Sequence, residues 1–156
     1  MNLFAMMDAS GQAMQAERMR AEVVAANMAN AETTRTEQGG PYHRQMVVFS
    51  ASQGDENFLD TMAAATGVRQ STLASGTNVA PSVEISRVVE DPSPPLKRYD
   101  PNHPDADAAG YVSYPDINPL TEMVDLMGAT RAYGLNGSAV QAEKGMITAA
   151  LDIVKS

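Results

Sequence analysis

The sequence contains no cysteine and no tryptophan, and aromatic residues make up only 5% of its 156 residues. The absence of cysteine excludes disulfide bonds and any thiolate-bound metal. Large rings supply much of the area that globular cores bury, and methionine is common at adaptable contacts. The scarcity of rings, together with eleven methionines, therefore favours thin contacts between helices. An ordinary core rich in Met and Ala is the alternative interpretation.

Positive charge and long apolar runs are scarce as well. The chain has 11 basic and 19 acidic residues, and its middle, residues 51–110, is the most acidic part. Nucleic-acid binding needs a basic surface that neutralises phosphates, so we expect no nucleic-acid partner. No segment approaches the ~18 apolar residues of a membrane span, and the first residues lack the regions of a cleavable signal peptide. We therefore expect no membrane span and no cleaved leader.

Residues that carry catalysis are few, because the chain has two histidines and no cysteine. It contains no nucleophile elbow, phosphate-binding loop, dinucleotide fingerprint or zinc-protease motif. We therefore predict no enzyme, no catalytic residues, no cofactor and no metal. The one competing pattern is the loop Asp100–Asp107 with His103, whose carboxylates and imidazole suit a metal- or carbohydrate-binding module. Prolines and aspartates at this density are more typical of turns.

Both ends of the chain read as long amphipathic helices, from Leu3 to Ala31 and from Pro119 to Val154. Asn118 is a favoured N-cap, Pro119 suits the first helical position, and Glu122 and Asp125 suit the helix dipole. Apolar residues repeat every seven positions, which predicts a narrow seam on each helix. Four glycines in the C-terminal segment leave two shorter helices as an alternative. The seam residues are Leu3, Met7, Met14, Val24 and Met28 in the first helix, and Leu126, Tyr133, Val140, Ile147, Leu151 and Val154 in the second.

The middle of the chain reads as short strands and loops. Tyr42–Phe49, Val83–Glu90 and Tyr111–Tyr114 have strand patterns, and Asp55–Ala65 has the pattern of a short helix. The prolines that follow Asp91 block regular structure there. The predicted fold class is α+β, with two long terminal helices paired in a coiled-coil-like layer and a small central β-rich region.

Several motifs resemble those of a known family. The run Asn27–Arg35 (NMANAETTR) resembles the signature that follows the N-terminal helix in bacterial flagellar rod and hook proteins. The continuation Thr36–Arg44, the middle blocks Val89–Pro94 and Tyr99–Ala106, and the helical block Asn118–Met127 agree in order and spacing. Over most of its length the chain is similar to the flagella basal body rod protein family, in particular to proximal rod proteins. Another rod or hook-like axial protein is the alternative.

This resemblance implies a structural subunit of the flagellar basal body. Such proteins pass unfolded through the flagellar export apparatus and assemble with copies of themselves and other rod proteins into the drive shaft that carries motor torque to the hook. By this resemblance, residues 1–35 with 118–156 form the inner helical tube and residues 36–117 form an outer β-containing domain. The seam residues named above are then assembly contacts. Asn27, Asn30, Thr33, Thr34 and Arg35 form the junction between the helix and the outer domain, with Arg35 available for an acidic group on a neighbouring subunit.

Overall fold

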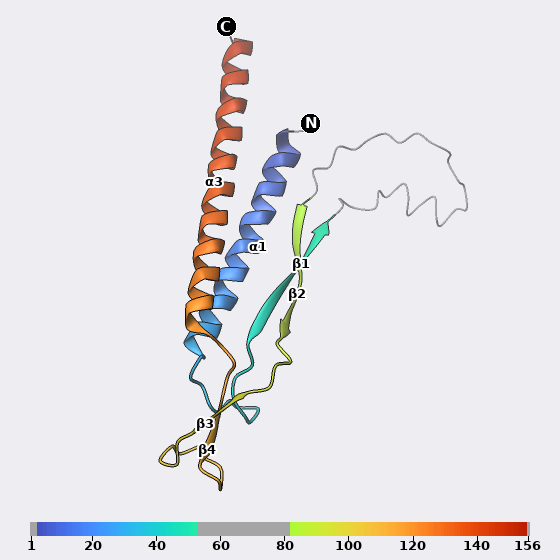
Figure 1. Ribbon diagram of the computed structural model, residues 1–156. Coiled ribbons are helices and arrows are strands. Elements are labelled where there is room, and N and C mark those ends of the chain that lie inside the picture. Colours follow the sequence, from blue (N-terminus) through green and yellow to red (C-terminus); the bar gives the residue numbers. More distant parts are fainter. Residues whose placement is uncertain (1–2, 53–81, 156) are drawn as a thin grey trace, which may run out of the picture.

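The computed structural model describes residues 3–52 and 82–155, and two long helices dominate it. Helix α1 spans Leu3–Ala29 and helix α3 spans Pro119–Lys155. They lie side by side and run in opposite directions, so both chain ends are at the same end of the molecule, where α3 extends beyond α1 (Figure 1). Both predicted helices are confirmed, with ends shifted by one or two residues. Within the described residues, no helix is long and apolar enough to cross a membrane.

Helix α3 begins as predicted and runs without a break. The side chain of Asn118 caps it, because its Oδ1 accepts a hydrogen bond from the N–H of Leu120 at 3.0 Å. The helix continues through all four of its glycines, so the alternative of two shorter helices is wrong. A methyl group at any of these glycines would have no other atom within 4 Å. The glycines therefore leave the helix surface open at those positions.

The contact between the helices is narrow and unusually polar. On α1, the buried apolar residues are Ala16, Val23 and Val24, and on α3 the only one within the described range is Ala129. A second row of α3 residues at seven-residue spacing is more buried than the apolar row predicted from the sequence: Glu122, Ala129 and Glu143 are buried and Asn136 is half-buried. Two of its four members are acidic and one is an amide. The sequence pattern hid this row because polar residues occupy it.

A β-hairpin packs along α1. Strands β1 (Gln45–Ser52) and β2 (Ser82–Glu90) pair antiparallel, with Gln45 opposite Glu90 and an irregularity after Val48. The hairpin contacts α1 and runs beside it (Figure 1). The first strand begins later than predicted, because Tyr42 and Arg44 contact the helices instead. The predicted helix Asp55–Ala65 lies outside the described residues.

A second, smaller hairpin lies at the end of the molecule away from the chain termini (Figure 1). Strand β4 (Tyr111–Tyr114) is confirmed, and it pairs with β3 (Leu96–Tyr99), which the sequence did not predict. All four β3 residues are exposed, so no apolar alternation marks the strand. Gly110 in the connecting loop has φ +80°, and a Cβ there would lie 2.9 Å from the Tyr99 ring. Both observations require glycine at this turn.

Candidate functional site, a buried polar junction

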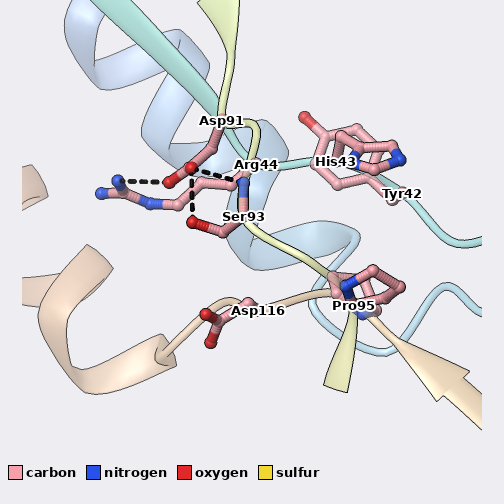
Figure 2. A pocket seen from close by; sticks show the side chains of 8 residues that line it. Tyr42, His43, Arg44, Asp91, Ser93, Pro95 and Asp116 are labelled. Carbon is pink, nitrogen blue, oxygen red and sulfur yellow. Dashed lines mark hydrogen bonds and ion pairs between the residues drawn. The ribbon is translucent and has the colours of Figure 1, made fainter. Parts of the chain in front are cut away.

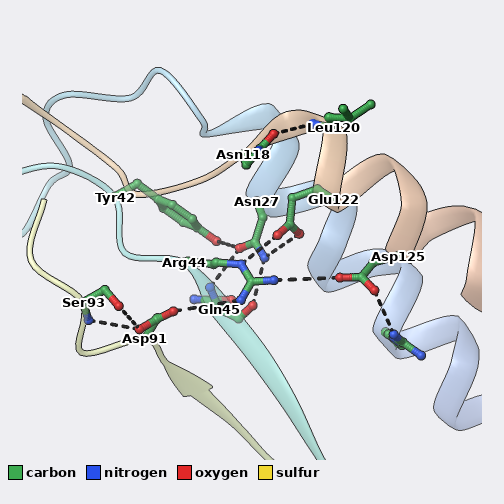
Figure 3. Close-up of polar contacts among 11 residues, drawn as sticks. Asn27, Tyr42, Arg44, Gln45, Asp91, Ser93, Asn118, Leu120, Glu122 and Asp125 are labelled. Atoms are coloured by element: carbon green, nitrogen blue, oxygen red, sulfur yellow. Dashed lines mark hydrogen bonds and ion pairs between the residues drawn. The ribbon is translucent and has the colours of Figure 1, made fainter. Parts of the chain in front are cut away.

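Asn27 lies near the end of α1 and is completely buried. Its side-chain amide pairs with the backbone of Gln45, donating to the carbonyl oxygen at 2.9 Å and accepting from the N–H at 2.9 Å (Figure 3). The amide thus binds the edge of β1 as a neighbouring strand would. Nδ2 also donates to Glu122 Oε2 at 3.1 Å, and Oδ1 accepts from the Tyr42 hydroxyl at 3.1 Å. Every donor and acceptor position of this amide is therefore used.

Arg44 is the second centre of the site. Its Nε donates to Glu122 Oε1 at 2.7 Å, and its other nitrogens lie 3.9 Å from carboxylate oxygens of Asp91 and Asp125. Glu122 is only 1% exposed, and Arg44 and Asn27 together satisfy both of its oxygens. Arg20 of α1 donates to Asp125 at 3.1 Å and links the two helices again. We call the set Asn27, Tyr42, Arg44, Gln45, Asp91, Glu122 and Asp125 the polar junction.

The surroundings of two groups in the polar junction, Tyr42 and Asp91, shift their pKa values in the direction that their partners need. Burial raises the pKa of the Tyr42 phenol above its usual value, and the carboxylates of Glu122 and Glu90 raise it further. Tyr42 therefore remains a neutral donor to Asn27. Hydrogen bonds from the Ser93 hydroxyl and N–H lower the pKa of Asp91, and the nearby charge of Arg44 adds to this effect. Asp91 therefore stays ionised beside Arg44 (Figure 2).

The crevice beside the polar junction is too small for a substrate. Its lining includes Tyr42, His43, Arg44, Asp91 and Asp116 (Figure 2), and its volume of about 10 Å³ admits about one water molecule. In the described segments, no group of three His, Cys, Asp or Glu side chains is placed to hold a metal. The geometry joins α1, α3 and the start of the β1–β2 hairpin at one point. Its chemistry is that of a structural joint.

The predicted junction residues after α1 all make contacts within the chain. Asn30 Nδ2 donates to the carbonyl of Ala26 at 2.9 Å, and the Thr33 hydroxyl donates to Asn30 Oδ1 at 3.1 Å. The Thr34 hydroxyl donates to Asp105 at 2.8 Å, and the Arg35 guanidinium lies 3.7 Å from the same carboxylate. Arg35 therefore has an acidic neighbour in its own chain, and its pairing with an acidic group of a neighbouring subunit stays a prediction.

The acidic loop Asp100–Asp107 uses its side chains for its own turns. The Asp105 carboxylate accepts a hydrogen bond from the Thr34 hydroxyl and forms an ion pair with Arg35. The Asp105 N–H donates to His103 Nδ1 at 3.1 Å. Asp107 accepts the N–H groups of Ala109 and Tyr111 at 2.8 and 2.9 Å, and these bonds lower its pKa. The two carboxylates are therefore engaged in holding the loop and in docking it to the end of α1.

The predicted seam residues do not all have the same surroundings. Val24 is buried, and seven residues are half-buried: Leu3, Met7, Met14 and Met28 on α1, and Leu126, Val140 and Ile147 on α3. Tyr133 and Leu151 are exposed, at 43% and 55%. Val154 lies in the last turn of α3. Most of the predicted seam therefore lies at least half-buried within the chain, and other α3 residues form its exposed apolar surface.

Arg44, Glu122 and Tyr42 are the important residues that sequence reasoning missed. A charged residue at the entry of a strand or in the first turn of a helix is usually on the surface, and Glu122 was explained by the helix dipole alone. Arg44 and Glu122 lie 78 positions apart, so no local pattern relates them. The available signal was the seven-residue spacing of Glu122, Ala129, Asn136 and Glu143.

The fold and the junction together define a class: a structural subunit whose long terminal helices carry its main surface and whose polar junction serves as a joint. Comparison with known proteins agrees. Residues 108–153 match the family model described as flagellar basal body rod FlgEFG protein C-terminal. The chain is 39% identical to the flagellar basal-body rod protein FlgC of Bacillus subtilis, over 99% of this chain and 100% of the relative. It is 33% identical to FlgC of Borreliella burgdorferi, over 99% of both chains, and 31% identical to FlgC of Escherichia coli O157:H7, over 98% of both.

The chain belongs to the flagellar basal-body rod protein FlgC family. It is a structural component of the flagellar rod, not an enzyme, and it assembles with rod proteins. The resemblance in the sequence motifs is thereby confirmed. The metal- or carbohydrate-binding alternative is not supported by this membership.

Proposed function

We propose that the α1–α3 pair is the part of the subunit that packs into the rod, and that neighbouring copies cover the exposed face of α3. One observation carries this proposal. Apolar side chains that are half-exposed or more lie on the side of α3 that faces away from the row Glu122, Ala129, Asn136 and Glu143: Leu120, Met123, Val124, Met127 and Leu135. We call these residues the apolar face of α3. A contiguous exposed apolar surface of this kind is typical of an interaction site.

This packing divides the chain into a helical part that contacts neighbouring subunits and an outer part that does not form the tube. Residues 1–35 and 118–156 form the inner, tube-forming unit, and residues 36–117 form an outer layer. The polar junction supports this proposal because it ties the hairpin to both helices where the two parts meet. Most of the predicted seam residues then hold α1 to α3 within one subunit, and Tyr133, Leu151 and the apolar face of α3 contact neighbours.

The proposed partners are copies of this chain, other rod proteins and, before assembly, the flagellar export apparatus. A chain that passes this apparatus unfolded must open easily and refold without covalent repair. The absence of cysteine removes disulfide bonds as an obstacle. The thin, partly acidic contact between α1 and α3 buries little apolar surface, which favours a free subunit that unfolds readily.

Substitution Leu135→Asp tests the packing face. Leu135 is 73% exposed, so the change places a charge in the proposed interface without disturbing the fold of the free subunit. We expect cells that carry the variant to lose rods and motility, while the free chain unfolds at the same urea concentration as the unchanged chain. The matched control is Gln15→Asp, because Gln15 is also exposed and uncharged but lies on α1, outside the apolar face of α3. Normal swimming of the Leu135→Asp strain would contradict the proposal.

A further inference from the structure

Glu143 is a buried carboxylate without a partner. It is only 4% exposed, and its Oε2 atom is buried and receives no hydrogen bond. Among the ion pairs of residues 3–52 and 82–155, none includes Glu143. Glu122 occupies the same row of α3 and is equally buried, but Asn27 and Arg44 satisfy it. The chain therefore supplies hydrogen-bond partners for Glu122 and none for Oε2 of Glu143, although both carboxylates lie in the same row of α3.

The position of Glu143 explains why α1 does not satisfy it. Glu143 follows Glu122 by 21 residues, which is about 31 Å along the helix. Because α1 runs the opposite way and Asn27 meets Glu122, Glu143 lies opposite the first turns of α1. The first turn of α1 contains no acidic residue, so its positive dipole favours a carboxylate there. The dipole offsets part of the desolvation but supplies no hydrogen bond to Oε2.

Arg131, on the outside of the same helix, is an exposed positive charge without an ion-pair partner among the described residues. Met127 and Leu135 lie four residues before and after it, so its guanidinium stands within the apolar face of α3. A buried carboxylate needs a cationic partner with hydrogen-bond donors, and arginine meets this need with a planar set of five.

We propose that Arg131 of one copy pairs with Glu143 of a neighbouring copy in the rod; this inference rests on the proposed packing of the α3 face. Met146 follows Glu143 by three residues on the same side of the helix and is 51% exposed, so a neighbour that also covers Met146 lies beside Glu143. The two members of the pair occupy different places on one chain, so the contact is head-to-tail. Contacts of this type extend into an open helical array and do not close as a two-fold dimer. A rod requires an open array.

Charge exchange in cells tests the pairing. The single variants Glu143→Arg and Arg131→Glu each place like charges together, and we expect each to lose rods from basal-body preparations and to abolish swimming. The double variant restores opposite charges, and we expect it to recover rods and swimming. Singles that assemble normally, or a double variant that assembles no better than the singles, would overturn the pairing.

The free full-length chain supplies a second measurement that does not depend on assembly. Glu143→Gln removes an unpaired buried charge, so we expect the thermal unfolding midpoint to rise by about 2–4 °C. The matched control Glu122→Gln removes a paired charge and should lower the midpoint. A fall with Glu143→Gln would show that the chain satisfies this carboxylate itself and would overturn the inference. If Leu135→Asp prevents assembly while the charge variants do not, only the pairing fails; if Leu135→Asp assembles, the packing face itself is wrong.

Discussion

Substitution Asn27→Leu is expected to lower the free energy of unfolding by about 3–5 kcal/mol, because it leaves several buried polar groups without partners. Leucine has the same branching and the same number of side-chain heavy atoms as asparagine and is the bulkier of the two, so the change opens no cavity and the loss reflects mainly the hydrogen bonds. The change removes partners from the N–H and carbonyl of Gln45, from the Tyr42 hydroxyl and from Glu122. Urea unfolding of the free chain, followed by circular dichroism, measures the effect.

Asn30 supplies the control for Asn27 within the same motif. It is half-buried, and its side chain donates only to the carbonyl of Ala26 and accepts only from Thr33. The expected loss for Asn30→Leu is about 1–2 kcal/mol, because the change removes only two part-buried hydrogen bonds of about 0.5–1 kcal/mol each. Equal losses for the two variants would show that the polar junction has no special weight in the fold.

Substitution Arg44→Met is expected to cost about 3–5 kcal/mol as well, since it leaves the charge of the buried Glu122 with only one neutral donor. Replacing both residues, as in Arg44→Met with Glu122→Leu, removes the uncompensated charge. We therefore expect the double variant to be more stable than Arg44→Met alone. A double-mutant cycle in urea gives the coupling energy directly.

An exposed ion pair of the same chemistry is the control for this cycle. Arg18 and Glu22 lie 2.9 Å apart on the outside of α1, with side chains 74% and 54% exposed. Solvent screens such a pair, so Arg18→Met should change stability by less than about 0.5 kcal/mol. Additive losses for Arg44 and Glu122 would contradict the central place given to their contact.

The sequence was sufficient for those parts of the fold that depend on local rules. The cap at Asn118 and the apolar periodicity predicted α3 with its correct start, because capping and periodicity act within a few residues. Strand β3 was missed because prolines precede it and all its residues are exposed. It exists through its pairing with β4, a contact between residues that no local pattern joins.

The site was less predictable than the helices, and the reason is physical. Asn27 was assigned to a junction on the strength of a family motif, but its pairing with the edge of β1 depends on where the hairpin packs. Glu122 and Glu143 break the rule that seams are apolar, so hydrophobic periodicity passes over them. A buried charge is recognisable only when its partner, or the lack of one, is seen in three dimensions.

The polar junction and the apolar face of α3 have different roles in the proposed assembly of the rod. The polar junction holds the hairpin to both helices by charged and uncharged contacts that require a fixed geometry. The apolar face of α3 is left uncovered by the chain's own residues. We therefore assign rigidity within the subunit to the polar junction and propose that the apolar face of α3 provides cohesion between subunits.

Protection of a single introduced cysteine at position 135 tests the cohesive role of the α3 face most directly. The chain has no cysteine of its own, so Leu135→Cys gives one site for a thiol-reactive label and keeps the position uncharged. The account predicts rapid labelling of the free chain and strong protection in isolated basal bodies, because neighbouring subunits cover the α3 face there. Equal labelling rates in the free chain and in basal bodies would contradict it.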